Sequence, residues 1–167
     1  MNKRKFDTAF LVQAAVIAAI YAALTLFAAP ISFGAQQFRI SEALTVLPVL
    51  TPAAIPGLAV GCVITNLGSP YGIIDIICGA SATFLAALCT RASRNIRFRK
   101  LPVLSLIFPV IFNGIIVGLE ISFFLPDGIS FFGFAASAAG VAFGELVSCY
   151  ALGLPLYAAL SKTRIFR

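Results

Sequence analysis

The chain has 167 residues, of which 60% are hydrophobic and 11% are charged, and its mean hydropathy is +1.03. Soluble domains carry about 45–50% apolar and about 25% charged residues, so 12 basic and 6 acidic side chains are too few to cover a water-exposed surface. The composition predicts an integral membrane protein. It excludes a soluble enzyme, a secreted disulfide scaffold and a nucleic-acid-binding domain, despite a pI near 9.5.

The residue types present leave little scope for catalysis or metal binding. The chain has no His and no Trp, and it lacks the G-x-x-x-x-G-K-[ST] loop that binds nucleotide phosphates. Four cysteines lie in apolar runs without a C-x-x-C pair, which is typical of small packing residues. We therefore expect no enzymatic activity, no cofactor and no metal site; the cysteines are Cys62, Cys78, Cys89 and Cys149.

Basic residues gather in three patches, and each patch adjoins a hydrophobic run. The positive-inside rule places such patches in the cytoplasm, which predicts that both termini are cytoplasmic. Nucleic-acid binding is the competing interpretation, but the adjoining hydrophobic runs favour the membrane. The patches are Lys3, Arg4 and Lys5; Arg91, Arg94, Arg97, Arg99 and Lys100; and Lys162, Arg164 and Arg167.

The first half of the chain contains three apolar segments. Residues 8–29 form a long one that ends at Pro30, and we favour a retained helix over a signal peptide because a signal peptide has a shorter apolar stretch. Residues 42–51 and 53–67 are shorter than the usual span of about 20 residues. They predict either two short helices or a re-entrant hairpin, and both return the chain to the outer side.

Three further segments follow, at residues 70–91, 101–125 and 131–161. Ser69-Pro70 is typical of a helix start, and Pro126-Asp127-Gly128 is typical of a turn. The prediction is a single all-α membrane domain, a bundle of six transmembrane segments that crosses the plasma membrane several times.

Carboxylates fall within or beside the predicted spans rather than in the cytoplasmic patches. A charged side chain at the bilayer centre costs about 2.5–3.5 kcal/mol on insertion scales, so such groups should face a cavity or one another. We expect an acidic pocket open to the outside, covered by loops 31–41 and 66–72. The candidate substrate-binding residues are Gln36, Gln37, Arg39, Glu42, Asn66, Tyr71, Asp75, Asn113, Glu120 and Glu145.

Several of these residues have a structural alternative. Glu42 follows Ser41 and suits a helix N-terminus, and Arg39 can pair with Glu42 without touching a ligand. Asn113 can form an interhelical hydrogen bond, and Tyr71 can be an interfacial anchor. Asp127 is best explained as a turn residue.

An acidic pocket suits a ligand that is cationic or rich in N–H donors, because ionised carboxylates only accept hydrogen bonds. A cation channel is the alternative, but the polar groups cluster in the outer half instead of lining a complete path. The first segment also offers a smooth surface on which another helix can dock. That surface consists of two rows, Ala14, Ala18 and Ala22, and Ala15, Ala19 and Ala23; ordinary internal packing is the other interpretation.

The chain contains the stretches FRISEALTVLP at 38–48, TPAAIPGLAVGCVITNL at 51–67 and GIIDIICGASATFLAAL at 72–88. These three stretches resemble the QueT family, the membrane S components of energy-coupling factor transporters for queuosine precursors. The resemblance implies a substrate-binding subunit that works with a T subunit and two ATPases, and contact of the first-segment alanines with the T subunit. It also implies a 7-deazaguanine substrate, such as the 7-aminomethyl form or queuine.

The resemblance and the acidic residues agree chemically. One of Glu42, Glu120 or Glu145 would bind the guanine-like edge, and Asp75 or a second glutamate would neutralise the ammonium. Arg39 and the two glutamines would belong to the lid. An S component for another vitamin or nucleobase is the alternative, followed by a small channel or a structural membrane subunit.

Overall fold

The computed structural model describes residues 7–29, 38–126 and 128–163, and all of its regular elements in these ranges are helical. The first half contains α1 (Thr8–Phe27), the 3₁₀ helix η1 (Ile40–Val49), α3 (Ala54–Asn66) and α4 (Ile73–Ala92). The second half contains η2 (Leu104–Leu106), α5 (Ile107–Phe123), α6 (Phe131–Leu146), the π-helix η3 (Val147–Gly153) and α7 (Leu154–Leu160).

Four helical stretches in the described part are long and apolar enough to cross a membrane. They are Thr8–Phe27, Ile73–Ala92, Leu104–Phe123 and Phe131–Leu160. The helices η1 and α3 correspond to the two short predicted segments at 42–51 and 53–67. They have only 10 and 13 residues. The described part of the structure therefore agrees with an all-helical membrane protein and has four helical stretches long enough to span a membrane, together with two shorter apolar helices.

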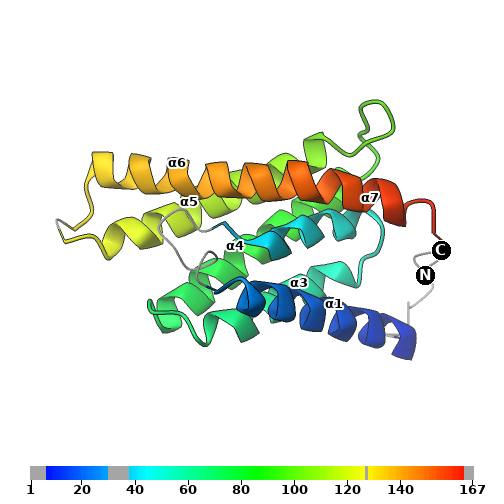
Figure 1. Ribbon diagram of the computed structural model, residues 1–167, viewed down its shortest axis with the longest axis horizontal. Coiled ribbons are helices and arrows are strands. Elements are labelled where there is room, and N and C mark those ends of the chain that lie inside the picture. The colour runs from blue at the N-terminus through cyan, green and yellow to red at the C-terminus, as the bar shows by residue number, and fades with distance from the viewer. Residues whose placement is uncertain (1–6, 30–37, 127, 164–167) are drawn as a thin grey trace, which may run out of the picture.

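The 3₁₀ helix η1 lies in the interior of the bundle, and every residue from Ser41 to Val49 is buried. It passes among α1, α3, α4 and η3 (Figure 1). Irregular backbone is tolerated at membrane depth only where protein surrounds it. Pro48, which lacks an N–H, lies within this helix and prevents a regular α-helical ladder there.

The last span also departs from a regular helix. Its centre widens into η3, just before Pro155 in the first turn of α7. Because proline removes one backbone donor and clashes with the preceding turn, a regular α-helix cannot pass through this point unchanged. Such π segments often occur at functional sites.

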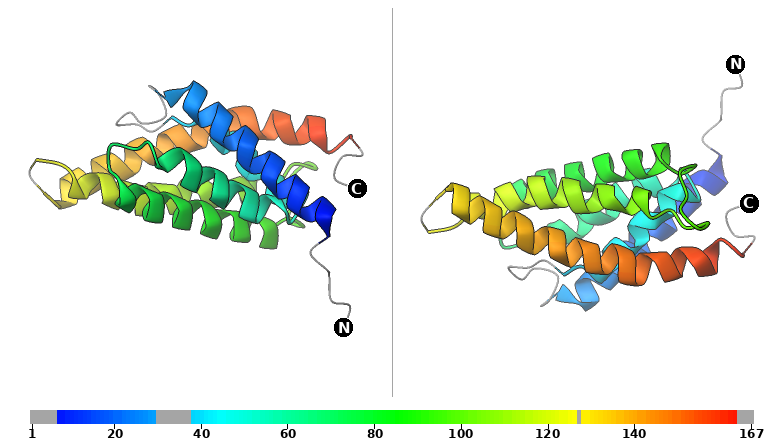
Figure 2. Two further views of the ribbon diagram at one scale, coloured as in Figure 1. Left: turned by 90° about the horizontal axis from the view of Figure 1, so that it is seen from below. Right: turned by 90° about the horizontal axis from the view of Figure 1, so that it is seen from above.

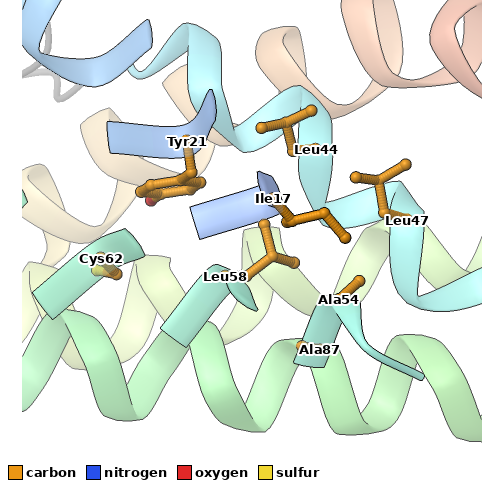
Figure 3. Close-up of a cluster of buried hydrophobic side chains, with 8 residues drawn as sticks. All are labelled: Ile17, Tyr21, Leu44, Leu47, Ala54, Leu58, Cys62 and Ala87. Carbon is orange, nitrogen blue, oxygen red and sulfur yellow. The ribbon is translucent and has the colours of Figure 1, made fainter. Parts of the chain in front are cut away.

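Close packing in the first half joins α1, η1, α3 and α4 around one apolar cluster (Figure 3). Tyr21 and Ile17 from α1 face Leu58 and Cys62 from α3, and all four are at most 5% exposed. The helices α5 and α6 also pack closely. A Cβ atom on Gly118 would lie 2.6 Å from the Cα atom of Ala138.

The two ends of the bundle differ in charge. The beginning of α1, the end of α7 and the loop between α4 and α5 lie at one end, as two views show (Figures 1 and 2). The α3–α4 and α5–α6 connections lie at the opposite end. The described basic residues of the second and third patches, those at 91–100 and Lys162, are therefore at the same end of the molecule, and the first patch lies outside the described residues.

Candidate functional site

Four carboxylates lie in the interior of the bundle. Glu42, Asp75, Glu120 and Glu145 are each at most 4% exposed, and Arg39 beside them is also 4% exposed. None of the four points toward the surface that lipid would cover. The four come from η1, α4, α5 and α6, so the fold brings together residues far apart in the sequence.

The first group of polar contacts joins the segment before η1 to α3 and α4. The Arg39 guanidinium lies 3.9 Å from Asp75 Oδ1. Asn66 Nδ2 donates to the same oxygen at 3.1 Å and to the Asp75 carbonyl at 2.9 Å. Asn66 has this position because residue 79 is glycine; a Cβ atom there would lie 2.4 Å from Nδ2.

The second group surrounds Glu42 at the start of η1. The Tyr21 hydroxyl donates to Glu42 Oε1, which links α1 to η1. Thr45 Oγ1 donates to the Glu42 carbonyl at 2.6 Å, and the Cys149 thiol lies 3.6 Å from the same oxygen. Cys149 belongs to η3, so the π segment contacts this group directly.

Glu145 on α6 is the one of these four carboxylates in which both oxygens accept hydrogen bonds from the described chain. Asn113 Nδ2 on α5 donates to Glu145 Oε1 at 2.9 Å. The Cys149 thiol, one helical turn away, donates to Oε2 at 3.7 Å. Cys149 therefore connects Glu145 to Glu42, and the interhelical hydrogen bond that was one interpretation of Asn113 is present.

Several buried oxygens have no hydrogen-bond partner among residues 7–29, 38–126 and 128–163. Glu120, on the last turn of α5, has no such partner at either carboxylate oxygen. The complete set is Glu42 Oε2, Asp75 Oδ2, Glu120 Oε1, Glu120 Oε2 and Ser148 Oγ. Every member can accept a hydrogen bond.

Some predicted residues lie elsewhere. Tyr71 is only half-buried, in the α3–α4 connection, and its ring centroid is 4.9 Å from that of Phe124. This aromatic pair fits an anchor better than a buried binding residue. Arg39 pairs with Asp75, whereas the sequence suggested Glu42. Gln36, Gln37 and Asp127 lie outside the described residues.

Sequence reasoning missed Tyr21, Ser148 and Cys149. Cys149 follows Glu145 by four residues, which places both on one helix face, so spacing alone offered a signal. Tyr21 is in an alanine-rich helix and nothing in its neighbourhood marks it.

The two alanine rows of α1 have different surroundings. Ala18 and Ala22 are buried. This row packs against two glycines of α3. A Cβ atom on Gly57 would lie 2.7 Å from the Ala14 carbonyl oxygen, and one on Gly61 would lie 3.0 Å from the Ala18 carbonyl oxygen. The row of Ala14, Ala18 and Ala22 therefore packs inside the chain. The row of Ala15, Ala19 and Ala23 is exposed.

Apolar cavities lie on two sides of α1 in the described part of the chain, and no buried carboxylate lines either of them. One of about 640 Å³ lies between α1, η1 and α7, and one of about 310 Å³ lies beside the beginnings of α1 and α3. In the part of the chain that the structure describes, no three His, Cys, Asp or Glu side chains are placed to hold a metal ion.

Comparison with known proteins identifies the family. The chain is 33% identical over 84 residues to the queuosine precursor transporter QueT of Lactococcus lactis subsp. cremoris (strain MG1363), and the match covers 49% of each chain. It thus spans about half the length of this relative. No solved structure matches. Residues 11–162 match the model of the QueT transporter family, and the chain belongs to that family.

Proposed function

We propose that this chain is the substrate-binding S component of an energy-coupling factor transporter that imports a queuosine precursor. It forms a single multi-pass domain in the plasma membrane and works with a T subunit and two ATPase subunits. The family membership supports a transport role. The printed name of the Lactococcus relative supports the substrate class.

The observation that carries the proposal is the excess of buried acceptors over buried cations. Four carboxylates share the interior with one guanidinium, and three of them have at least one oxygen without a partner in the described part of the chain. Isolated buried charges are costly, so a solute that brings N–H donors and positive charge would relieve this cost. A 7-aminomethyl-7-deazaguanine offers both.

Glu120 is the carboxylate best suited to the guanine-like edge. Guanine presents two parallel N–H donors on one edge, from its ring nitrogen and its exocyclic amine. A carboxylate with two available oxygens accepts such a pair in bidentate fashion. Asp75 and Glu42, each with one available oxygen, would neutralise the ammonium, and Arg39 would hold Asp75 in position. Gln36 and Gln37 would complete the lid.

Charge distribution supports cytoplasmic termini and six membrane segments. The described residues of two basic patches, those at 91–100 and Lys162, lie at one end of the bundle with the beginning of α1 (Figure 1), and the positive-inside rule assigns that end to the cytoplasm. In this orientation η1 and α3 enter from the outer side and return, which adds two short segments to the four long ones. Asp75 and Glu120 lie near the helix ends opposite the basic patches. In this orientation they are in the half of the bundle nearer the outer side of the membrane.

The exposed alanine row of α1 is the docking face we propose for the T subunit. Ala15, Ala19 and Ala23 present small side chains on the outside of the bundle. Small residues let another helix approach closely in a membrane. The buried row, Ala14, Ala18 and Ala22, is already occupied by α3.

Titration of the purified full chain tests the substrate. We expect submicromolar binding of 7-aminomethyl-7-deazaguanine and weaker binding of the uncharged 7-cyano form, because the ammonium would lose its carboxylate partner. Thiamine and riboflavin should not bind. Asp7→Asn, which removes an exposed carboxylate, is the control and should bind like the wild type.

Other outcomes would favour the alternatives. Preference for thiamine or riboflavin would assign the chain to another vitamin. Ion conductance in liposomes without partners, together with failure to co-purify with an ATPase pair, would favour a channel.

A further inference from the structure

The loop between α4 and α5 ends in a tight turn that presents basic side chains. The Phe98 and Leu101 backbones exchange two hydrogen bonds of 2.9 Å, which closes a turn around Arg99 and Lys100. We call residues 94–101 the cationic turn. Residues 95–100 are exposed.

The backbone of the cationic turn is unusual. Arg99 and Lys100 have φ angles of 48° and 70°, and in the described part of the chain they are the two non-glycine residues with positive φ. Turns with positive φ at both central positions favour Asn, Asp and Gly, because side chains with a Cβ atom clash there. Two long cationic side chains at these positions are not explained by backbone preference.

The base of the cationic turn is fixed to the bundle. Ser93 Oγ and Ser105 Oγ are 2.8 Å apart and buried, and Thr90 Oγ1 donates to the Ser105 carbonyl at 3.0 Å. The Tyr150 hydroxyl donates to the Val103 carbonyl at 2.9 Å. The tip therefore has a defined place at the end of the bundle, as Figure 1 shows for the loop that projects beyond α4 and α5.

Apolar side chains alternate with the cations in this turn. Ile96 is 55% exposed and Phe98 is 67% exposed, and the Arg99 guanidinium carbon lies 5.7 Å from the centre of the Phe98 ring. The ion pair between Arg39 and Asp75 lies in the interior, and no described carboxylate pairs with Arg97, Arg99 or Lys100. The cationic turn thus combines exposed apolar groups with positive charge that the described chain does not neutralise.

We propose that the cationic turn binds the phosphate of an anionic phospholipid while Phe98 enters the interfacial region of the bilayer. The turn connects the spans Ile73–Ala92 and Leu104–Phe123, so its height is that of the lipid headgroups. Negative headgroups complement Arg97, Arg99 and Lys100, and exposed apolar side chains with adjacent cations are typical of membrane interfaces. This inference depends on the membrane location and not on the transported substrate.

A single-tryptophan reporter tests this proposal directly. The chain has no Trp, so Phe98→Trp introduces the sole tryptophan. The full-length variant is placed in nanodiscs that contain acyl-brominated phosphatidylglycerol or acyl-brominated phosphatidylcholine at equal mole fraction. We expect quenching by both lipids and stronger quenching by the phosphatidylglycerol, because that lipid is enriched around the turn.

Two lysine substitutions in the Phe98→Trp chain separate a local site from general charge. Lys100→Gln should lower the preference for phosphatidylglycerol about fivefold. This factor corresponds to the attraction of about 1 kcal/mol between one basic side chain and an anionic membrane surface. Lys162→Gln removes the same charge from another exposed lysine and should leave the preference unchanged. Three results would each overturn the proposal. The first is equal quenching by the two lipids, and the second is an equal effect of the two substitutions. The third is no quenching, which is expected if the turn docks on a protein.

Discussion

Glu120 and Glu145 are the same residue type, are buried to the same degree and lie on adjacent helices, yet their surroundings differ. They are 4% and 3% exposed. Both oxygens of Glu145 accept hydrogen bonds, from Asn113 and Cys149. Neither oxygen of Glu120 has a partner within the described residues. Burial is therefore the same for both, and only the availability of the oxygens distinguishes Glu120, which the proposed function assigns to the solute.

The difference separates two roles within one acidic interior. A carboxylate that joins two helices by hydrogen bonds contributes to the stability of the bundle, and its loss leaves a buried donor unsatisfied. A carboxylate without partners contributes little to stability and is available to a solute.

Gly118 sets the distance between the helices that carry the two glutamates. In Gly118→Ala the new Cβ atom would lie 2.6 Å from the Ala138 Cα atom and 2.9 Å from its backbone nitrogen, so α5 and α6 must separate. We expect a loss of about 3 kcal/mol, the upper part of the range for overpacking, and a lower melting temperature in detergent. Gly68→Ala, where the nearest atom is 3.8 Å away, is the control. Equal melting temperatures would contradict close α5–α6 packing.

Replacement of each glutamate by alanine compares the two directly. Glu145→Ala removes the acceptor of Asn113 and should lower the free energy of unfolding by about 1–3 kcal/mol. Glu120→Ala breaks no hydrogen bond with the described chain and should cost less. Thermal unfolding of the ligand-free proteins measures both. A larger loss for Glu120→Ala would show that the partners assigned to Glu145 are not the ones that matter.

Tyr21→Phe should leave Glu42, like Glu120, without a side-chain hydrogen-bond donor in the described residues. The substitution removes the hydroxyl that donates to Glu42 Oε1 and leaves neither carboxylate oxygen with a side-chain partner in the described residues. We expect a loss of about 0.5–1.5 kcal/mol, the net value of one hydrogen bond. Tyr157→Phe alters a buried tyrosine whose hydroxyl has no hydrogen bond in the described chain, and its melting temperature should not change. Identical results for both variants would remove Tyr21 from the site.

The exposed alanine row of α1 extends the same reasoning to an outer surface. Ala19→Leu should change the stability of the isolated chain by less than about 0.5 kcal/mol, as is usual for surface positions. It should nevertheless reduce co-purification with the T subunit and the ATPases. Ala136→Leu, at an exposed alanine of α6, should reduce neither. Normal assembly of the Ala19 variant would exclude this row as the docking face.

Sequence patterns predicted the long helices and the burial of the carboxylates, because hydrophobic runs and charge depletion carry those signals directly. They did not predict the partners. Asn113 and Glu145 are 32 residues apart, and Tyr21 and Glu42 are 21 apart, so only the packing of different helices brings them together. The π segment before Pro155 and the 3₁₀ form of η1 depend on the same tertiary surroundings.

The most direct test of the acidic interior as a solute site is the affinity of Glu120→Gln for 7-aminomethyl-7-deazaguanine, measured beside its melting temperature. The amide keeps the shape but removes the charge and one acceptor oxygen. We predict a melting temperature equal to that of the wild type or higher, and an affinity about tenfold to a hundredfold weaker, from the loss of about 1.5–3 kcal/mol for a hydrogen bond to a charged group. Wild-type affinity in this variant would contradict the account.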